Sequence, residues 1–314
     1  MEIVITDGHT LNPGDLNWHG FEAIGKVKYH DRTAPIEAIG RCYSADIIVT
    51  NKTIINADVI AAASHLQMIA VTATGYNNVD VAAAKNKEIV VCNVPGYGTY
   101  SVAQHSFALL LQLTNQVGIN AASVSKGEWY NAKDWCYSLQ PIIELKDKVL
   151  GIIGMGKIGK QVAAIARAFG MQIIYFGGRE EVPSAKKTSL HKLFMQSDFI
   201  SLHCPLTKDN YAFVNKELLG LMKPTAFLIN TARGALINEK DVAQAVEQKT
   251  IAGAALDVLG TEPPEKNNPL IGLPNCIITP HNAWMSVEAR GRIMQTTLEN
   301  IQAFIKGHPQ NMAD

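Results

Sequence analysis

The stretch Val149-Leu-Gly-Ile-Ile-Gly-Met-Gly-Lys-Ile-Gly159 decides the fold of this chain. Its first five residues predict a buried strand, and the amphipathic stretch 160–169 that follows predicts a helix. The three glycines between them each have a use: the first permits a tight turn, the second lets the backbone approach a pyrophosphate, and the third lets the helix pack on the strand. Because the helix N-terminus then faces an anion, the stretch predicts a dinucleotide-binding turn, with a glycine-rich turn without a ligand as the alternative. Its residues are Gly154, Met155, Gly156, Lys157, Ile158 and Gly159.

Similar units lie on both sides of this turn. Short apolar runs rich in Val and Ile alternate with longer amphipathic stretches, which is typical of strand–helix units around a buried parallel sheet. The apolar runs lie at 3–6, 47–50, 68–72, 89–92, 149–153, 172–176, 199–202, 226–230, 252–256 and 276–279. Turn formers and a proline gather before Gly98, so we expect the first domain boundary there. The pattern predicts an α/β protein with doubly wound parallel sheets in two domains.

Size and composition agree with two domains and exclude several classes of protein. The chain has 314 residues, 47% of them apolar, and its 28 Lys and Arg balance 28 Asp and Glu. Such a chain buries a large core, and neither disorder nor nucleic-acid binding is expected of it. No stretch approaches the roughly 18 apolar residues of a membrane span, so we expect no membrane partner and no leader.

The cysteines and histidines predict neither disulfides nor a metal site. The five cysteines are scattered and form no C-x-x-C pair, and the nine histidines lack the spacing of zinc ligands. Scattered thiols fit a reducing compartment. We therefore expect a cytoplasmic protein without a metal.

The segment after the second strand of the glycine-turn domain bears on the choice of cofactor. An Asp or Glu about 20 residues after the turn normally binds the ribose 2′-hydroxyl of NAD. The residues found there are Gly177, Gly178 and Arg179. An arginine can pair with a 2′-phosphate in a charge-assisted fork, so NADPH is slightly favoured over NADH. The alternative is that Glu180 or Glu181 neutralises the arginine or binds the ribose itself.

Three further motifs follow predicted strands: NTARG at 230–234, DVLGTEP at 257–263 and TPHNAW at 279–284. Together with the glycine turn and with TGYNNVD at 74–80, they resemble the D-isomer-specific 2-hydroxyacid dehydrogenase family across nearly the whole chain. The stretch GYGTYSVAQ at 96–104 and the TPHNAW motif look most like the glycerate dehydrogenase and hydroxypyruvate reductase branch. An ordered Arg, Glu and His behind a dinucleotide turn is far more specific than any one motif.

This resemblance implies two Rossmann-like domains. The NAD(P)-binding domain, residues 99–284, would be inserted into a split substrate domain formed by residues 1–98 and 285–314. The strand pattern alone predicts two α/β domains, whereas the split of the substrate domain comes only from the family.

The resemblance also implies catalytic roles for Arg233, Glu262 and His281. The arginine would hold the carboxylate of a 2-oxo acid and polarise the adjacent carbonyl, because its guanidinium is planar and carries several donors. The histidine would protonate the carbonyl oxygen as hydride reaches the carbon, since an imidazole donates and accepts protons near neutral pH. The glutamate would hydrogen-bond the imidazole.

Substrate binding is implied for four more residues. Ala73, Thr74 and Gly75 match the loop whose backbone N–H groups meet the substrate carboxylate in the family, and small uncharged residues suit such a nest. Many relatives carry Asp where Asn77 stands, so a charge is absent here. Trp284 would shape the pocket for a short polar acid, with a core tryptophan as the alternative.

Cofactor contacts are implied outside the glycine turn as well. The matching positions are Thr99, His203, Pro205, Thr207, Thr231, Ala232 and Asp257. The carboxylate of Asp257 would hold the nicotinamide carboxamide, and capping of a loop is the alternative. Thr99 and Thr207 are turn hydroxyls in the alternative interpretation. Asn210 stands where the family usually has a threonine.

These residues together imply an oxidoreductase that transfers a hydride between NAD(P)H and a short 2-oxo acid to give a D-2-hydroxy acid. Hydroxypyruvate is the expected first substrate and glyoxylate the second. A D-lactate or phosphoglycerate type of dehydrogenase is the alternative within the family, although a phosphorylated substrate would need more basic residues. From another class, the same fold serves as a nucleotide-sensing corepressor that binds partner proteins, and motifs alone do not exclude it.

The polar segment 118–141 predicts an interface. It carries the aromatic residues Trp129, Tyr130, Trp135 and Tyr137, an unusual density for a solvent loop. We expect a homodimer through the cofactor domain and this segment. A loop that folds onto its own domain is the alternative.

Overall fold

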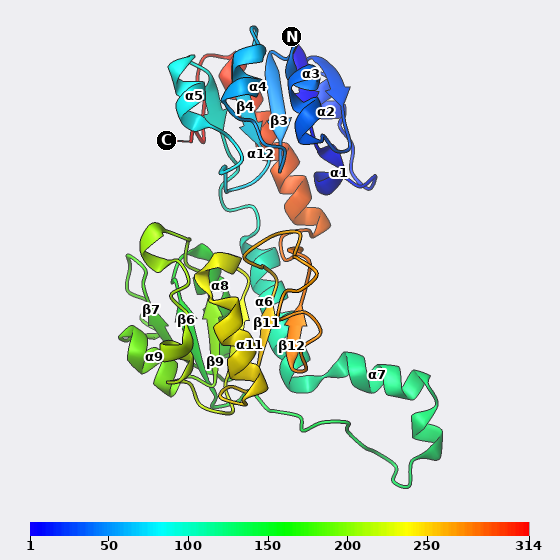
Figure 1. Ribbon diagram of the computed structural model, residues 1–314, viewed down its shortest axis with the longest axis vertical. Helices are drawn as coiled ribbons and strands as arrows, with labels where there is room; N and C mark the ends of the chain where they lie inside the picture. Colours follow the sequence, from blue (N-terminus) through cyan, green and yellow to red (C-terminus); the bar gives the residue numbers. More distant parts are fainter. Residues whose placement is uncertain (314) are drawn as a thin grey trace. The chain divides into compact units, whose positions relative to one another are not determined.

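The computed structural model describes residues 1–313. The chain divides into two compact units, Met1–Gly98 with the segment from Trp284 onward, and Thr99–Ala283. Each unit holds one parallel sheet flanked by helices (Figure 1), so the predicted α/β fold with two doubly wound domains is confirmed. The second unit interrupts the first, which is therefore built from both ends of the chain.

The first unit is built on a five-stranded parallel sheet with the order β2-β1-β3-β4-β5. Its strands are β1 (Glu2–Ile5), β2 (Lys26–Tyr29), β3 (Ile47–Thr50), β4 (Met68–Val71) and β5 (Val90–Cys92). β3 and β4 are buried along their whole length, as expected for Val- and Ile-rich strands between two layers of helices. The sequence pattern missed β2, because its Lys-Val-Lys-Tyr sequence at the sheet edge forms no apolar run.

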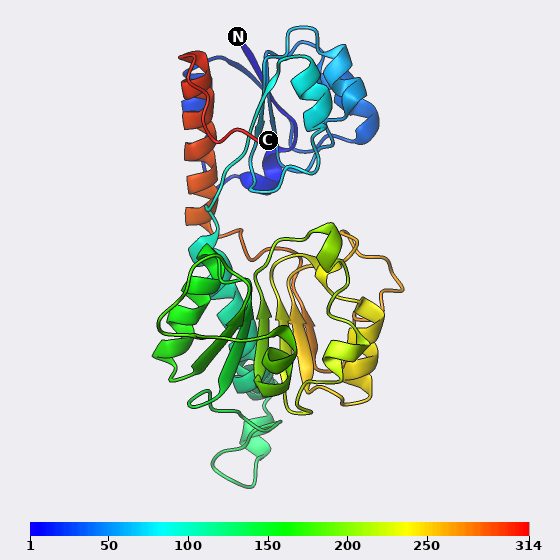
Figure 2. The ribbon, with the colours of Figure 1, turned by 90° about the vertical axis from the view of Figure 1, so that its left-hand side faces the viewer.

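Helices cover both faces of this sheet. They are α1 (Gly8–Leu11), α2 (His19–Glu22), η1 (Pro35–Glu37), α3 (Ala38–Cys42), α4 (Ala57–Ala62), α5 (Val81–Asn86) and α12 (Val287–Ile305). Helix α12 packs on β4 from one face, and Figure 2 shows α3, α4 and α5 on the opposite face. The last helix of the chain thus completes the first unit.

The second unit contains a seven-stranded parallel sheet with the order β12-β11-β10-β9-β6-β7-β8. Its strands are β6 (Val149–Ile153), β7 (Gln172–Phe176), β8 (Lys186–Lys187), β9 (Phe199–Leu202), β10 (Phe227–Asn230), β11 (Gly253–Leu256) and β12 (Cys276–Ile278). β6 lies between β7 and β9, so the order of strands reverses there. In doubly wound sheets the ligand crevice lies at the carboxyl ends of the strands at such a reversal.

Two helical layers enclose this second sheet. Helices α6 (Thr99–Asn115) and α8 (Lys157–Ala168) share one apolar cluster with it. Helices α9 (Leu190–Gln196), α10 (Lys216–Leu219) and α11 (Glu239–Glu247) share another. The short turns η3 (Lys208–Asn210) and η4 (Gly234–Leu236) lie in loops.

An arm, defined here as residues 117–141, leaves the body of the second unit (Figure 1). It contains α7 (Val117–Ser125) and the turn η2 (Glu128–Asn131). Its aromatic side chains are exposed, Tyr130 to 92% and Trp135 to 87%. The indole N–H of Trp129 donates to the carbonyl of Trp135 at 3.1 Å, so the tip of the arm holds its own shape.

The described part of the chain shows neither a membrane helix nor a disulfide. No helix within residues 1–313 has the length and apolar character to cross a membrane. All five cysteines carry free thiols. Over the same residues, no group of three or more His, Cys, Asp or Glu side chains is arranged to hold a metal ion.

Candidate active site

The glycine turn joins β6 to α8, and the structure shows what a side chain would meet at each of its three glycines. Gly154 has a φ of +98°, and a Cβ there would lie 2.5 Å from the backbone nitrogen of Cys204. A Cβ on Gly159 would overlap the carbonyl oxygen of Gly154, so the helix packs against the turn only without one. A Cβ on Gly156 would meet no atom within 4 Å. The space beside Gly156 is therefore open to a ligand.

The N-terminus of α8 offers hydrogen-bond donors to that space. Gly156 is the N-cap residue, and no side chain caps the helix. The first backbone N–H groups of α8 therefore have no partner within the helix, and the dipole of its 12 residues adds partial positive charge at this end. These residues fit the pyrophosphate of a dinucleotide.

The loop after β7 turns through Gly177 at a φ of +75° and Gly178 at +109°. Arg179 follows with an exposed side chain, and no ion pair joins it to another of the residues 1–313. Glu180 pairs with Lys160 of α8, and the hydrogen bond from Lys160 holds the pKa of the Glu180 carboxyl below its ordinary value. In the structure Glu180 is therefore engaged with the helix and not with Arg179.

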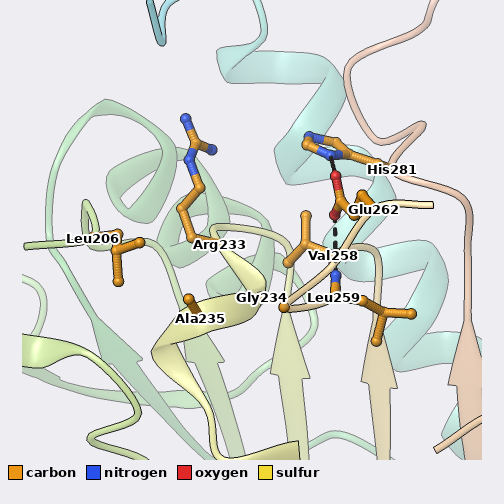
Figure 3. Close-up of a pocket in the computed structure, with 9 residues that line it drawn as sticks. Leu206, Arg233, Gly234, Ala235, Val258, Leu259, Glu262 and His281 are labelled. Carbon is orange, nitrogen blue, oxygen red and sulfur yellow. Dashed lines mark hydrogen bonds and ion pairs between the residues drawn. The ribbon is translucent and has the colours of Figure 1, made fainter. Parts of the chain in front are cut away.

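Arg233, Glu262 and His281 line one pocket of about 190 Å³ at the strand ends of the second sheet (Figure 3). The three residues follow three different strands, β10, β11 and β12. Parallel strands end at the same edge of a sheet, so residues far apart in the sequence meet there. The rest of the lining comes from Leu206, Gly234, Ala235, Val258, Leu259 and Gly260.

Glu262 connects His281 to the loop beneath it (Figure 3). Its Oε2 atom lies 2.5 Å from Nδ1 of His281, and its Oε1 atom accepts the backbone N–H of Leu259 at 3.0 Å. The glutamate is thereby fixed at both oxygens and orients the imidazole. With Nδ1 engaged, Nε2 is the ring nitrogen that remains for a reacting group.

Arg233 stands in a loop that Asn230 and Gly234 shape. The buried Asn230 side chain accepts the N–H of Ala232 at 3.0 Å and donates to the carbonyl of Arg233 at 2.9 Å. A Cβ on Gly234 would overlap the carbonyl group of Leu259, so the two backbones touch. The guanidinium of Arg233 is exposed and donates to the carbonyl of Ala232 at 2.8 Å, which leaves its other donors for a ligand in the pocket.

Glu239, the first residue of α11, supports the site although no motif marks it in the sequence. Its carboxylate accepts the N–H of Gly260 at 2.7 Å and the side-chain amide of Asn268 at 2.9 Å, so it fixes the loop that carries Glu262. An acidic residue in the first turn of a helix is typical of simple capping. The sequence therefore holds no signal that separates the two roles.

His203 lies against the glycine turn, where its backbone would collide with a Cβ on Gly154. Its Nε2 atom is 2.8 Å from the hydroxyl of Ser201, and its Nδ1 atom is buried without a hydrogen-bond partner among residues 1–313. Burial lowers the pKa of this imidazole to about 4, so it is neutral near pH 7. An unpaired buried nitrogen beside the turn suits a polar group of a bound cofactor.

Asn210 and Thr231 use their polar groups inside the protein. Asn210 accepts the N–H of Thr207 at 2.7 Å and donates to the carbonyl of Pro205 at 2.8 Å, so the residue that replaces the usual threonine shapes this turn. The Thr231 hydroxyl lies 2.9 Å from that of Ser106 in α6. The cofactor contacts expected of Thr99, Pro205, Thr207, Thr231, Ala232 and Asp257 stay predictions.

The predicted substrate residues of the first unit follow β4 and precede α12. The Thr74 hydroxyl donates to the carbonyl of Val94 at 2.9 Å. Trp284 is buried, and its ring meets that of Tyr97 edge to face with 6.1 Å between centroids. Their substrate roles, like those of Ala73 and Gly75, stay predictions.

Comparison with known proteins links these motifs to one family. Residues 107–283 match the family model described as D-isomer specific 2-hydroxyacid dehydrogenase, NAD binding domain. A hydroxypyruvate reductase of Blautia hydrogenotrophica is 43% identical over 321 residues, with 100% of both chains covered. A glycerate dehydrogenase of Methylorubrum extorquens is 39% identical, with 91% of each chain covered. The solved structure of an acyclic imino acid reductase (Bsp5) in complex with NADPH and D-Arg has a TM-score of 0.87 at 35% identity and covers 100% of both chains.

Proposed function

The chain belongs to the D-isomer specific 2-hydroxyacid dehydrogenase family, and from this premise we propose that it reduces hydroxypyruvate to D-glycerate with NAD(P)H. Glyoxylate is the second substrate. The hydroxypyruvate reductase and glycerate dehydrogenase relatives support this order, because they align over nearly the whole chain. Membership of the family makes the protein a nicotinamide-dependent oxidoreductase of small hydroxy acids.

One observation carries the proposal: the 2.5 Å contact of His281 with Glu262 lies in a pocket that Arg233 also lines. A cation beside a hydrogen-bonded imidazole is the arrangement that binds a carboxylate and protonates a neighbouring oxygen. The pocket of about 190 Å³ supports a short acid.

Reduction of the 2-oxo acid then divides between these residues. The guanidinium of Arg233 binds the carboxylate and polarises the adjacent carbonyl. The reduced nicotinamide, when bound, supplies a hydride to the carbonyl carbon. Nε2 of His281 gives a proton to the carbonyl oxygen, while Glu262 holds the ring through Nδ1. The hydride and the proton together convert the ketone to an alcohol, and solvent returns a proton to the imidazole.

NADPH is the proposed preferred cofactor. The exposed guanidinium of Arg179 follows β7 where a 2′-phosphate is expected, and such a pair is charge-assisted. The ion pair of Glu180 with Lys160 supports this preference, because it keeps that carboxylate away from Arg179.

A homodimer in the cytoplasm completes the proposal. The exposed Tyr130 and Trp135 of the arm support it, since large aromatic side chains are enriched at interfaces. Sedimentation equilibrium of the purified protein should give the mass of two chains. A single-chain mass at micromolar concentration would contradict the dimer.

The experiment that tests the function follows nicotinamide absorbance with hydroxypyruvate, glyoxylate, pyruvate and 3-phosphohydroxypyruvate, each with NADH and NADPH. The highest kcat/KM is expected for hydroxypyruvate with NADPH. A preference for NADH would leave the proposed reductase activity in place but would contradict the binding of a 2′-phosphate by Arg179. A preference for pyruvate or the phosphorylated acid would move the chain to the D-lactate or phosphoglycerate type.

The absence of measurable turnover with all four acids would contradict the proposed function. If the protein still bound NADPH under those conditions, a nucleotide-sensing binding protein would become the better explanation. Fluorescence of the bound cofactor separates that case from a misfolded sample.

A further inference from the structure

His281 stands in a turn with an unusual backbone conformation. Its φ is +52°, a value that side chains other than glycine rarely adopt and that persists only where the surroundings hold it. The backbone N–H of His281 donates to the carbonyls of Asp257 at 2.8 Å and Thr279 at 2.9 Å. These bonds tie the turn to the ends of β11 and β12.

The carboxylate of Asp257 accepts hydrogen bonds from residues on both sides of His281 in this turn. Its Oδ1 atom accepts the hydroxyl of Thr279 at 2.6 Å and the N–H of Asn282 at 3.0 Å, and its Oδ2 atom accepts the N–H of Ala283 at 3.0 Å. Only 1% of this residue is exposed. Donors before and after His281 therefore converge on one buried carboxylate, which fixes the direction of the imidazole between them.

His105 of α6 reaches the same carboxylate through Thr279. Its Nε2 atom lies 3.0 Å from the Thr279 hydroxyl and 3.5 Å from Oδ1 of Asp257. A hydroxyl has one hydrogen, and the Thr279 hydroxyl gives it to the carboxylate. Nε2 of His105 must then be the donor to Thr279, so the network assigns its proton to that nitrogen. The chain of bonds anchors the turn to a helix of 17 residues whose inner face is buried.

We propose that Thr279 and His105 are positioning residues for His281, an inference that rests on the proposed function. Neither residue belongs to the lining of the pocket that holds Arg233, Glu262 and His281, so both act through the turn. Loss of the Thr279 hydroxyl removes the acceptor of His105 and one donor to Asp257 at the same time. The left-handed turn then relaxes, and the imidazole moves away from Glu262.

The test compares Thr279→Val, which keeps the shape of the side chain without its hydroxyl, with Thr279→Ser, which keeps the hydroxyl. We expect Thr279→Val to lower kcat for hydroxypyruvate about 10- to 100-fold, because small displacements of a catalytic group have effects of that size. The KM for the cofactor should change less than about twofold, since the glycine turn is untouched. Thr279→Ser should recover most of the lost turnover.

A matched control separates the effect of losing the hydroxyl at position 279 from the general effect of losing a buried hydroxyl. Thr114 lies in α6, is buried, and donates its hydroxyl to the carbonyl of Leu110 at 2.9 Å. Thr114→Val should lower the melting temperature without lowering kcat. An equal fall of kcat in Thr114→Val and Thr279→Val would overturn the positioning role.

Variants of His105 provide a second test, which remains available even if Thr279→Val does not fold. His105→Leu removes the donor and should lower kcat, while His105→Gln keeps an N–H donor and should recover part of it. In the double variant His105→Leu with Thr279→Val, kcat should fall little further than in Thr279→Val alone, because Nε2 of His105 lies closer to that hydroxyl, at 3.0 Å, than to the Asp257 carboxylate, at 3.5 Å. Losses that multiply would overturn the proposal.

Failure of this inference differs from failure of the proposed function. If the parent protein reduces hydroxypyruvate and Thr279→Val stays within about twofold of its kcat, the positioning role is wrong and the function stands. The same holds if Thr279→Ser loses as much turnover as Thr279→Val. If the parent protein reduces none of the four acids, the proposed function is wrong and the positioning role falls with it.

Discussion

Gly234 and Leu259 touch backbone to backbone, and a methyl group on Gly234 would overlap the carbonyl group of Leu259. This contact joins the loop of Arg233 to the loop of Glu262. The separation of the cation from the imidazole and its carboxylate partner therefore depends on the absence of one side chain.

Gly234→Ala should push these two loops apart. We expect kcat/KM for hydroxypyruvate to fall at least about 10-fold through misplacement of Arg233, and the free energy of unfolding to fall by about 1–3 kcal/mol through overpacking. Steady-state kinetics and urea unfolding measure the two effects. Gly291→Ala in α12 is the control, because a Cβ there meets no atom within 4 Å. Parental kcat/KM in Gly234→Ala would show that the site does not depend on the contact.

His281→Ala should lower kcat by about 10²- to 10⁴-fold, the usual contribution of a general acid. Cofactor affinity, measured by fluorescence of bound NADPH, should stay close to the parent value because the glycine turn is unchanged. His308→Ala, an exposed histidine of the C-terminal segment, serves as the control. Turnover that survives in His281→Ala would refute the role of the imidazole as proton donor.

Arg179→Ala should change the choice between the two cofactors. Loss of a charge-assisted pair with the 2′-phosphate is worth about 1.5–3 kcal/mol, so KM for NADPH should rise about 10- to 100-fold. KM for NADH should change little, since that cofactor lacks the phosphate. Arg32→Ala removes an exposed arginine of the first unit and controls for net charge. Equal changes for the two cofactors would exclude the phosphate pair.

His203 should make the apo protein sensitive to mild acid. Its folded-state pKa of about 4 lies below the ordinary histidine value, so between those two values the unfolded chain binds a proton that the folded chain does not. Stability is therefore full above about pH 7 and falls as the pH drops, with about 2 kcal/mol lost by pH 5. Urea unfolding of the parent and of His203→Gln at about pH 7 and about pH 5 measures this loss of stability. Equal losses in the two proteins would mean that another group causes them.

The fold was predictable where the sequence has long apolar runs. The strands predicted at 149–153 and 172–176 agree with β6 and β7 to the residue. β2 and β8 lie at sheet edges and are rich in lysine, so they leave no apolar pattern to detect. Each pairs on one side only, β2 with β1 and β8 with β7, so the backbone of the neighbouring strand and not an apolar pattern defines them.

The site was predictable as a set of motifs but not as a set of contacts. Arg233, Glu262 and His281 stand in recognisable stretches, and the structure brings them to one pocket. Glu239 was not predictable, because its partner Gly260 lies 21 residues away and only the folded loop brings them together. The ion pair of Glu180 with Lys160 was not predictable either, because Arg179 is next to Glu180 in the sequence and was the expected partner.

Helix α12, which packs on β4, also determines the order in which the two units are finished during translation. The second unit is one continuous segment and has its complete sheet before α12 leaves the ribosome. β1 to β5 are synthesised first, yet the face of their sheet on which α12 packs lacks that helix until the end of the chain emerges. A nascent chain stalled before Val287 should therefore carry a folded second unit beside an incomplete first one, which is the form most in need of a chaperone.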